Sequence, residues 1–262
     1  MDDISLKALA KINLGLDVVR RREDGYHEVR MIMQTIHLYD RLDITKTKEK
    51  DIKIQTNLSF LPVNENNLVY KAGKLLMDEF GITDGVSVKL DKRIPVAAGM
   101  AGGSADAAGV LVGLNALYGA KLSMSELCAL GAKVGADVPF ALMGGTCRVQ
   151  GVGDFIKALP PCPDCWFAVV MPDYGVSTPE AFAAYDKVGS SVHPDCEAQE
   201  NAVRAGDLDA VCAAAGNALE ECSGAADNEA IKALLMEHGA VTALMTGSGA
   251  AVFGVFRDEA SA

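Results

Sequence analysis

The sequence predicts a mixed fold, α+β or α/β, arranged as two domains. Segments with the period-two pattern of strands alternate with segments of helical spacing along the whole chain. The length of 262 residues leaves room for two cores. The clearest break in composition is PPCPDC, residues 160–165. We place the domain boundary just before it, between residues 1–158 and residues 159–262.

The elements of the first half follow from their patterns in chain order. Strands are predicted around Ile12, over 27–44 and over 86–90, where apolar and polar residues alternate. A helix is predicted over 67–80, with Gly81 as the residue that ends it. The apolar segment 104–118 predicts a buried helix.

The remaining elements carry clearer end signals. SMSE, residues 123–126, is a capping box that opens a further helix, and a strand follows over 146–150. In the second half Thr178 is the predicted N-cap of a helix, with Pro179 at its first position. WFAVVMP, AVTALM and AAVFGVF predict three strands, and a helix over 228–238 is predicted to end at Gly239.

Charge and composition limit the class of partner. The formal net charge is −11, which argues against a nucleic acid or an anionic membrane as the main partner. We expect no signal peptide and no membrane span, and therefore a cytoplasmic protein whose seven cysteines are reduced. Cys162 and Cys165 form one C-x-x-C without a second pair, which favours two loop thiols over a zinc site.

The first glycine-rich loop, residues 95–104, lies directly before the buried helix. A helix start offers unpaired N–H groups and a partial positive charge, so Gly99, Gly102 and Gly103 with Ser104 are a candidate phosphate cradle. The alternative is a tight turn without a ligand. The spacing fits neither the Walker A loop nor the G-x-G-x-x-G dinucleotide motif.

This loop, PVAAGMAGGSA, resembles the P-x-x-x-G-[LM]-x-G-G-S-[SA] loop of the GHMP small-molecule kinases. AKINL, DGYH, NENNLVYKA, GADVPF, NALE and MTGSGAAVFGVF, taken in this order, also resemble segments of one branch of that family. The resemblance covers nearly the whole chain. It implies a two-domain GHMP kinase fold of α+β class. The N-terminal domain is expected to be ribosomal protein S5 domain 2-like, and the C-terminal domain ferredoxin-like and short of its last helix and strand.

The resembled branch phosphorylates the 2-hydroxyl of 4-diphosphocytidyl-2-C-methyl-D-erythritol with ATP, in the non-mevalonate isoprenoid pathway. By resemblance, Asp137 in GADVPF is the catalytic base and Lys11 in AKINL is the catalytic lysine. On their own, these residues would be interpreted as a turn acid and an exposed strand charge. Asn13 lies on the same strand face as Lys11 and is expected to contact the substrate.

The resemblance also implies a site for the cytosine base. Tyr26 and His27 follow the Asp24-Gly25 turn and are assigned to it, with Phe182 as the opposing stacking residue and Thr178 as a further substrate contact. The alternatives are loop side chains for Tyr26 and His27, and core packing for Phe182.

The predicted nucleotide contacts surround the first glycine-rich loop. The loop itself is expected to hold the phosphates of ATP, with Mg²⁺ bridging them, and we name no metal ligand. The predicted contacts are Asn67, Lys92, Pro95, Ala98, Gly99, Met100, Ala101, Gly102, Gly103 and Ser104.

Other function classes stay open at this point. The N-terminal fold also occurs in ribosomal proteins, but the acidic charge opposes an RNA-binding module. A catalytically inactive relative would not need Lys11 and Asp137. Within the kinases, mevalonate or homoserine kinase is the alternative, and DGYH favours a substrate that carries a nucleobase. We expect a monomer or a weak homodimer.

Overall fold

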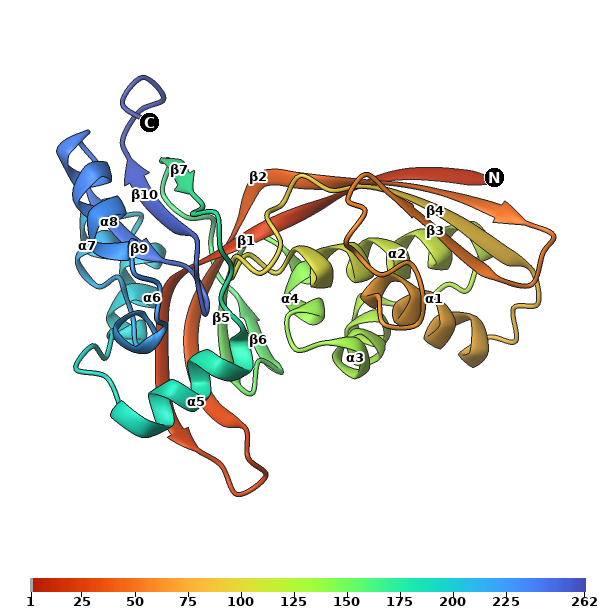
Figure 1. The fold of residues 1–262 in the computed structure, drawn as a ribbon, viewed down its shortest axis with the longest axis horizontal. Coiled ribbons are helices and arrows are strands. Elements are labelled where there is room, and N and C mark those ends of the chain that lie inside the picture. Colours follow the sequence, from red (N-terminus) through yellow and green to blue (C-terminus); the bar gives the residue numbers. More distant parts are fainter. Residues whose placement is uncertain (1) are drawn as a thin grey trace. The chain divides into compact units, whose positions relative to one another are not determined.

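The computed structural model describes residues 2–262, which form two compact units that interleave along the chain. The long strands β1 (Asp3–Arg21) and β2 (His27–Thr47) each contribute one part to each unit (Figure 1). The predicted boundary after residue 158 divides the chain once, whereas each unit is built from three segments. The first unit contains the chain through Ala10, His37–Ile94 and Ala101–Gly144, and the second contains Lys11–Ile36, Pro95–Met100 and Gly145–Ala262.

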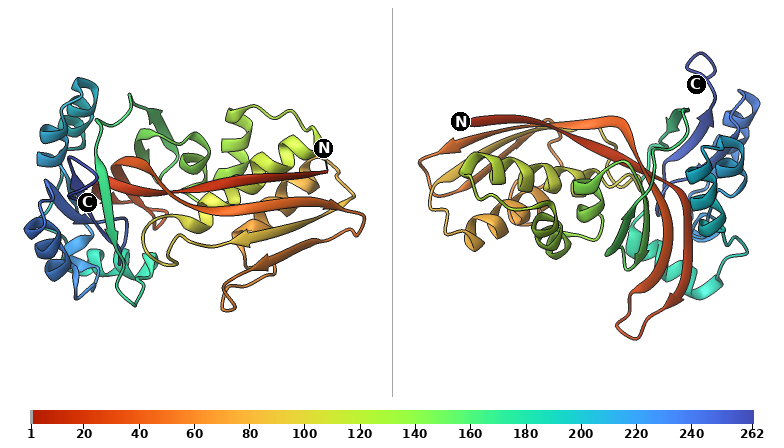
Figure 2. Two further views of the ribbon diagram at one scale, coloured as in Figure 1. Left: turned by 90° about the horizontal axis from the view of Figure 1, so that it is seen from above. Right: turned by 180° about the vertical axis from the view of Figure 1, so that it is seen from behind.

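The first unit is a sheet with helices on one face (Figures 1 and 2). In it β2 pairs antiparallel with β4 (Gly85–Asp91), and β4 pairs parallel with β3 (Ile52–Thr56). The helices are α1 (Leu68–Glu79), α2 (Gly102–Tyr118), α3 (Met124–Val134) and α4 (Val138–Met143).

Helix α2 lies close to the strands because it carries glycine on the face that meets them. A Cβ at Gly113 would lie 2.6 Å from Ile44 Cδ1, and a Cβ at Gly109 would lie 3.2 Å from Leu42 Cδ2. Ile44 and Leu42 are fully buried in β2. Close packing of buried apolar side chains therefore holds the helix that follows the first glycine-rich loop.

The second unit contains two groups of strands. The first part of β2 pairs antiparallel with β5 (Thr146–Gly151), β5 pairs with β6 (Phe155–Ala158), and β1 pairs with β8 (Gly216–Asn217). A separate antiparallel sheet has the order β7 (Trp166–Val170), β10 (Val252–Phe256), β9 (Thr242–Met245). The helices are α5 (Thr178–Val188), α6 (Cys196–Ala205), α7 (Leu208–Ala213) and α8 (Asn228–Glu237), with a 3₁₀ turn η1 (Glu220–Cys222).

Most predicted helix ends are confirmed, and one is wrong. Ser123 and Glu126 form the predicted capping box of α3, and Gly81 follows the end of α1 with φ 59°. The N-cap of α5 is Ser177, so Thr178 is its first helical residue and not its cap. The Thr178 hydroxyl instead forms a 2.8 Å hydrogen bond with Ser248 Oγ, an interaction that local sequence does not reveal.

Candidate functional site

The first glycine-rich loop has positive φ at alternate residues, namely Ala97 (55°), Gly99 (73°) and Ala101 (55°). Loops in which left-handed and right-handed helical residues alternate form concavities that bind anions, and positive φ at every second residue is compatible with such a loop. Positive φ strains an alanine, so neighbouring groups must hold it. The Ala97 carbonyl accepts a hydrogen bond from Val176 N at 3.2 Å, and the Ala101 carbonyl accepts one from Ala105 N at 2.9 Å.

Helix α2 begins directly after this loop without a side-chain cap, because Ala101 stands at the N-cap. The N–H groups of its first turn therefore point toward a position where an anion can bind. A Cβ at Gly102 would lie 3.0 Å from Ile94 Cγ2, whereas a Cβ at Gly103 would meet nothing closer than Leu68 Cδ1 at 3.4 Å. A Cβ at Gly102 would thus be crowded against Ile94, whereas a Cβ at Gly103 would make only an ordinary van der Waals contact.

Two further residues predicted to contact ATP have structural partners in the first unit. The Lys92 side chain is 3% exposed, and its ammonium donates to Asp106 Oδ2 at 2.7 Å and to the Asp40 carboxylate. Asn67 is the N-cap of α1 and accepts a hydrogen bond from Val69 N at 2.9 Å. Lys92 therefore fixes the chain just before the first glycine-rich loop. Asn67 fixes the start of α1.

In the second unit, Lys11 and Asn13 lie on one face of β1, as predicted from their spacing. Both are buried, and Lys11 Nζ donates to Asn13 Oδ1 at 2.6 Å. The same ammonium donates to the Gly99 carbonyl oxygen at 2.6 Å, and Lys11 N donates to the Met100 carbonyl oxygen at 3.2 Å. The predicted catalytic lysine is thus a buried cation that holds the first glycine-rich loop against β1.

The second glycine-rich loop, Thr246–Gly249, is in backbone contact with the first. A Cβ at Gly99 would lie 2.0 Å from the Thr246 carbonyl oxygen, and a Cβ at Gly247 would lie 2.7 Å from the Gly99 carbonyl oxygen. Asn13 N donates to Thr246 Oγ1 at 3.0 Å. Gly99 is therefore needed so that the two loops can approach each other. The sequence prediction explained this glycine only by the approach of a phosphate.

Asn217 is a buried residue that the sequence prediction did not include among the site residues. Its side-chain amide donates to the carbonyl oxygens of Met245 and Gly247, both at 2.8 Å, and its Oδ1 accepts from Leu219 N at 3.0 Å. These bonds fix the entry to the second glycine-rich loop. The NALE segment was the available signal, because it is part of the family resemblance.

Asp137, the predicted catalytic base, lies in the first unit at the start of α4. It is the N-cap of α4 with φ −85° and ψ −6°, and its side chain makes no capping hydrogen bond. The residues that follow it, Val138, Pro139 and Phe140, are buried. The half-buried carboxylate is therefore anchored by the apolar start of α4 and is not used as a cap.

The residues predicted to bind the cytosine base do not simply face each other as two stacking surfaces. The His27 ring stacks on Phe182 with centroids 4.7 Å apart and an interplanar angle of 25°. His27 Nε2 donates to Asp186 Oδ1 at 2.7 Å, and this hydrogen bond lowers the pKa of Asp186. The Tyr26 side chain is 67% exposed. One face of Phe182 is thus covered by His27, while Tyr26 is free to meet a ligand.

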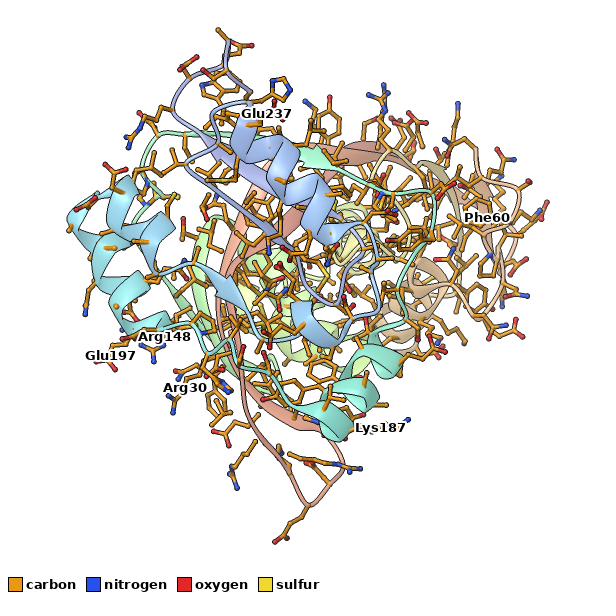
Figure 3. All side chains as sticks on the ribbon, turned by 60° about the vertical axis from the view of Figure 1, so that its left-hand side comes forward. Arg30, Phe60, Arg148, Lys187, Glu197 and Glu237 are labelled. Atoms are coloured by element: carbon orange, nitrogen blue, oxygen red, sulfur yellow. The ribbon has the colours of Figure 1, made fainter. Side chains whose placement is uncertain are left out.

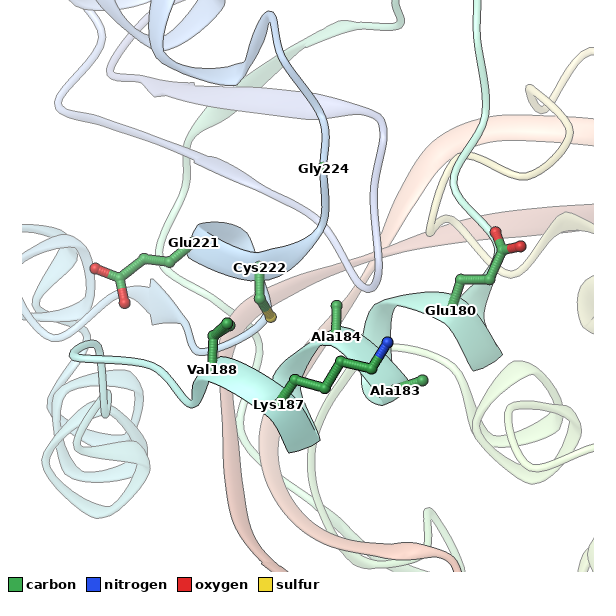
Figure 4. Close-up of a pocket in the computed structure, with 8 residues that line it drawn as sticks. All are labelled: Glu180, Ala183, Ala184, Lys187, Val188, Glu221, Cys222 and Gly224. Carbon is green, nitrogen blue, oxygen red and sulfur yellow. The ribbon is translucent and has the colours of Figure 1, made fainter.

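A groove of about 480 Å³ lies on the other side of α5 (Figure 4). Phe182, Tyr185 and Asp186 share the helix face that meets His27, and the groove is on the opposite face. None of the predicted substrate residues lines it. Its lining residues are Glu180, Ala183, Ala184, Lys187, Val188, Glu221, Cys222 and Gly224.

Residues 2–262 contain neither a cluster of metal-binding side chains nor a membrane-spanning helix. Within that range no three His, Cys, Asp or Glu side chains gather in a way that could hold a metal ion. The helices of the same range are too short or too polar to cross a membrane. Cys162 and Cys165 are free thiols, and a hydrogen bond from Cys165 lowers the pKa of Cys162.

Comparison with known proteins places the chain in a family. Residues 67–145 match the family described as GHMP kinases N terminal domain, and residues 199–262 match GHMP kinases C terminal. The chain belongs to the GHMP kinase family, which confirms the predicted fold and class of enzyme.

Within the family, one enzyme recurs among the similar proteins. The 4-diphosphocytidyl-2-C-methyl-D-erythritol kinase of Lachnospira eligens is 48% identical over 263 residues, which cover 100% of this chain and 91% of the relative. A crystal structure of 4-(cytidine 5'-diphospho)-2C-methyl-D-erythritol kinase is 36% identical with a TM-score of 0.80, covering 96% of this chain and 90% of that one.

A more distant structure shares the fold alone. Homoserine kinase from Cytophaga hutchinsonii has a TM-score of 0.74 at 17% identity, covering 100% of this chain and 87% of that one. The fold is therefore similar to that of both solved kinases, whereas the sequence is more similar to that of the 4-(cytidine 5'-diphospho)-2C-methyl-D-erythritol kinase.

Proposed function

We propose that this protein transfers the γ-phosphate of ATP to the 2-hydroxyl of 4-diphosphocytidyl-2-C-methyl-D-erythritol, a step of the non-mevalonate isoprenoid pathway. The observation that carries this proposal is the 48% identity, over the whole chain, to a relative that bears the name of this kinase. Homoserine kinase, the alternative within the family, is supported by fold similarity alone.

The phosphates of ATP are assigned to the first glycine-rich loop and the start of α2. The positive φ at alternate loop residues and the helix start without a side-chain cap both suit a multiply charged anion. Lys92 and Asn67 contribute by holding neighbouring elements in place.

Lys11 and Asp137 are assigned the chemical step. An alcohol is a weak nucleophile, so a carboxylate must accept its proton while a cation offsets the charge that develops on the transferred group. Asp137 is a carboxylate that caps nothing at the start of α4. Lys11 is a buried ammonium held by carbonyl and amide oxygens, which fixes its position before the substrate arrives.

The cytosine end of the substrate is assigned to Tyr26, His27 and Phe182. The exposed Tyr26 ring offers a stacking surface, and the ring pair of His27 and Phe182 offers a rigid wall. Asn13 and Thr178 are assigned to the rest of the substrate. Thr178 is held by Ser248 of the second glycine-rich loop.

Mg²⁺ is proposed to enter with ATP. The ion bridges β- and γ-phosphate oxygens and offsets their charge in kinases. Among residues 2–262 the side chains form no ready-made cation site, so we assign it no protein ligand. We further propose a cytoplasmic protein that is a monomer or a weak homodimer.

A substrate panel tests the proposal. ADP release is measured with ATP and equal concentrations of the diphosphocytidyl compound, mevalonate and homoserine. We expect turnover with the first alcohol and at least about 10³-fold lower kcat/KM with the other two, because they lack the base that the site holds. Preference for homoserine or mevalonate would refute the proposed substrate.

A further inference from the structure

The first unit contains a buried ionic cluster formed by Asp40, Lys92 and Asp106, here called the Asp40–Lys92–Asp106 cluster. The side chains are 0%, 3% and 4% exposed, respectively. They come from β2, from the residue after β4 and from the second turn of α2. Lys92 Nζ donates to both carboxylates, at 2.7 Å to Asp106 Oδ2. Burying these three ionisable side chains away from water costs desolvation free energy.

The cluster joins the two ends of the first glycine-rich loop. Asp40 Oδ1 accepts hydrogen bonds from Arg93 N at 2.5 Å and Ile94 N at 2.8 Å, the residues that lead into the loop. Asp106 lies just beyond the end of the loop, on α2. One ammonium thus connects the chain that enters the loop to the helix that leaves it.

Lys92 is also in contact distance of the first residue of α2. A Cβ at Gly102 would lie 3.1 Å from Lys92 Nζ, so the ammonium packs directly against the helix start. The Lys92 backbone is fixed in turn by Asn57, whose side chain accepts from Lys92 N at 2.8 Å and donates to Lys92 O at 3.0 Å. A change in the charge of the cluster therefore changes the electrostatic potential at the start of α2, where the N–H groups point out of the helix.

The charges of the cluster do not balance when both carboxylates are ionised. Two carboxylates and one ammonium leave a net charge of −1, and Asp106 Oδ1 is buried without a hydrogen-bond partner among residues 2–262. The charged groups that act on Asp106 are Lys92 and Asp40. Burial raises the pKa of Asp106 to about 8, although Lys92 opposes the shift. One proton on Asp106 makes the cluster neutral.

We propose that Asp40, Lys92 and Asp106 are positioning residues for nucleotide binding, and that the cluster favours ATP while it holds a proton and disfavours ATP after it has lost it. The inference rests on the proposed binding of phosphates at the first glycine-rich loop. Loss of the proton places a negative charge beneath the helix start that receives the triphosphate. The charge is buried and is therefore only weakly screened.

The test is the pH dependence of ATP affinity, measured by calorimetry between pH 7.2 and pH 9.5. In the wild type the Kd for ATP is expected to rise about tenfold across this range, the size of a weakly screened repulsion between nearby charges. In Asp106→Asn, which keeps the shape but cannot lose the proton, Kd is expected to stay within about twofold. Asp43→Asn, a partly exposed change on β2, is the matched control and should retain the wild-type rise.

A second measurement needs no variant. The carboxyl ¹³C signals of the wild type are titrated, and one aspartate is expected to titrate near pH 8. Titration of every carboxyl below pH 6, or an equal rise of Kd in Asp106→Asn and the wild type, would overturn the inference. ATP binding that does not change with pH contradicts this inference alone, whereas a folded protein that fails to bind ATP at pH 7.2 contradicts the proposed function as well.

Discussion

The Lys11 ammonium lies 2.6 Å from the Gly99 carbonyl oxygen, and this hydrogen bond attaches the first glycine-rich loop to β1. The carbonyl that it binds belongs to the glycine whose Cα faces the Thr246 carbonyl oxygen. Lys11 is therefore connected through one residue to both glycine-rich loops. A cation held this way is fixed in position before any substrate arrives, which is the condition for electrostatic catalysis.

Replacing Lys11 with methionine tests its role in the chemical step. The methionine keeps most of the volume and removes the charge, so kcat is expected to fall by about 10²–10³-fold. The control is Lys7→Met, an exposed lysine on the same strand, which should keep wild-type kcat. The measurement is steady-state turnover on protein whose circular dichroism is unchanged. A kcat for Lys11→Met within threefold of the wild type would show that the charge is not used.

Asp137→Asn tests the assignment of the base. Because asparagine cannot accept the proton of the alcohol, turnover is expected to fall by at least about 10²-fold while ATP affinity is retained. Asp227→Asn is a close control, since Asp227 is also an N-cap residue whose side chain makes no capping hydrogen bond. Its backbone likewise lies in the right-handed helical region, with φ −90° and ψ −3°. Equal turnover in the two variants would remove Asp137 from the mechanism.

Gly99→Ala tests the contact between the two glycine-rich loops. The new Cβ would lie 2.0 Å from the Thr246 carbonyl oxygen, so the loops must separate, and we expect the free energy of unfolding to fall by about 2–4 kcal/mol. Gly81→Ala is the control, because Gly81 also has positive φ but has nothing within 4 Å of the added atom. It is expected to cost about 1 kcal/mol. Urea unfolding measures both, and equal costs would contradict the loop contact.

Tyr26→Ala tests the site for the base. The ring is 67% exposed, so its loss should leave stability unchanged but weaken binding of the cytidine substrate by about 1–3 kcal/mol, the usual contribution of base stacking. The control is Phe155→Ala, an aromatic ring that is 68% exposed elsewhere in the same unit. Titration calorimetry compares the two variants. A loss of affinity no larger for Tyr26→Ala than for Phe155→Ala would count against this assignment.

The stability of the second unit depends on pH through Glu200 of α6. Burial alone would raise the pKa of Glu200, but hydrogen bonds from Arg148, Arg204 and Lys157 outweigh it and lower the pKa to about 2. Figure 3 shows Arg148 beside α6. A lowered pKa stabilises the folded state above the unfolded value of 4.5, and this contribution is lost as the pH falls toward 2.

Glu200→Gln is therefore expected to reduce the free energy of unfolding by about 2 kcal/mol at pH 7. The difference from the wild type should shrink below pH 4.5 and be largely lost at pH 2, where about half of Glu200 is protonated. Urea unfolding at three pH values measures the difference. A deficit that stays constant from pH 7 to pH 2.5 would mean that the charge of Glu200 is not the stabilising feature.

The elements that the sequence predicted well have strong local signals. The helix after the first glycine-rich loop is mostly apolar, and the capping box at Ser123 fixes the start of α3. Helices α6 and α7 were not predicted. The buried face of α6 includes the polar residues Gln199 and Glu200, which hides its helical period, although Asp195 and Asp207 cap the two helices.

The sequence names the candidate residues of the site, but it does not predict the contacts that they make. Lys11 and Asn13 were placed on one strand face by their spacing, and the structure joins them directly. The burial of Lys92 between two carboxylates depends on partners 52 and 14 residues away in the sequence. The stacking of His27 on Phe182 likewise joins residues from β2 and α5. Contacts of this kind follow from the fold and leave no local pattern.

The most direct test of the proposed function is ³¹P NMR of the product formed from ATP and 4-diphosphocytidyl-2-C-methyl-D-erythritol by the purified protein. We predict one new phosphomonoester resonance, on the 2-position of the erythritol, that grows at the rate at which ADP appears. ADP that appears without a new phosphomonoester, or a phosphate on another hydroxyl, would contradict the proposed reaction.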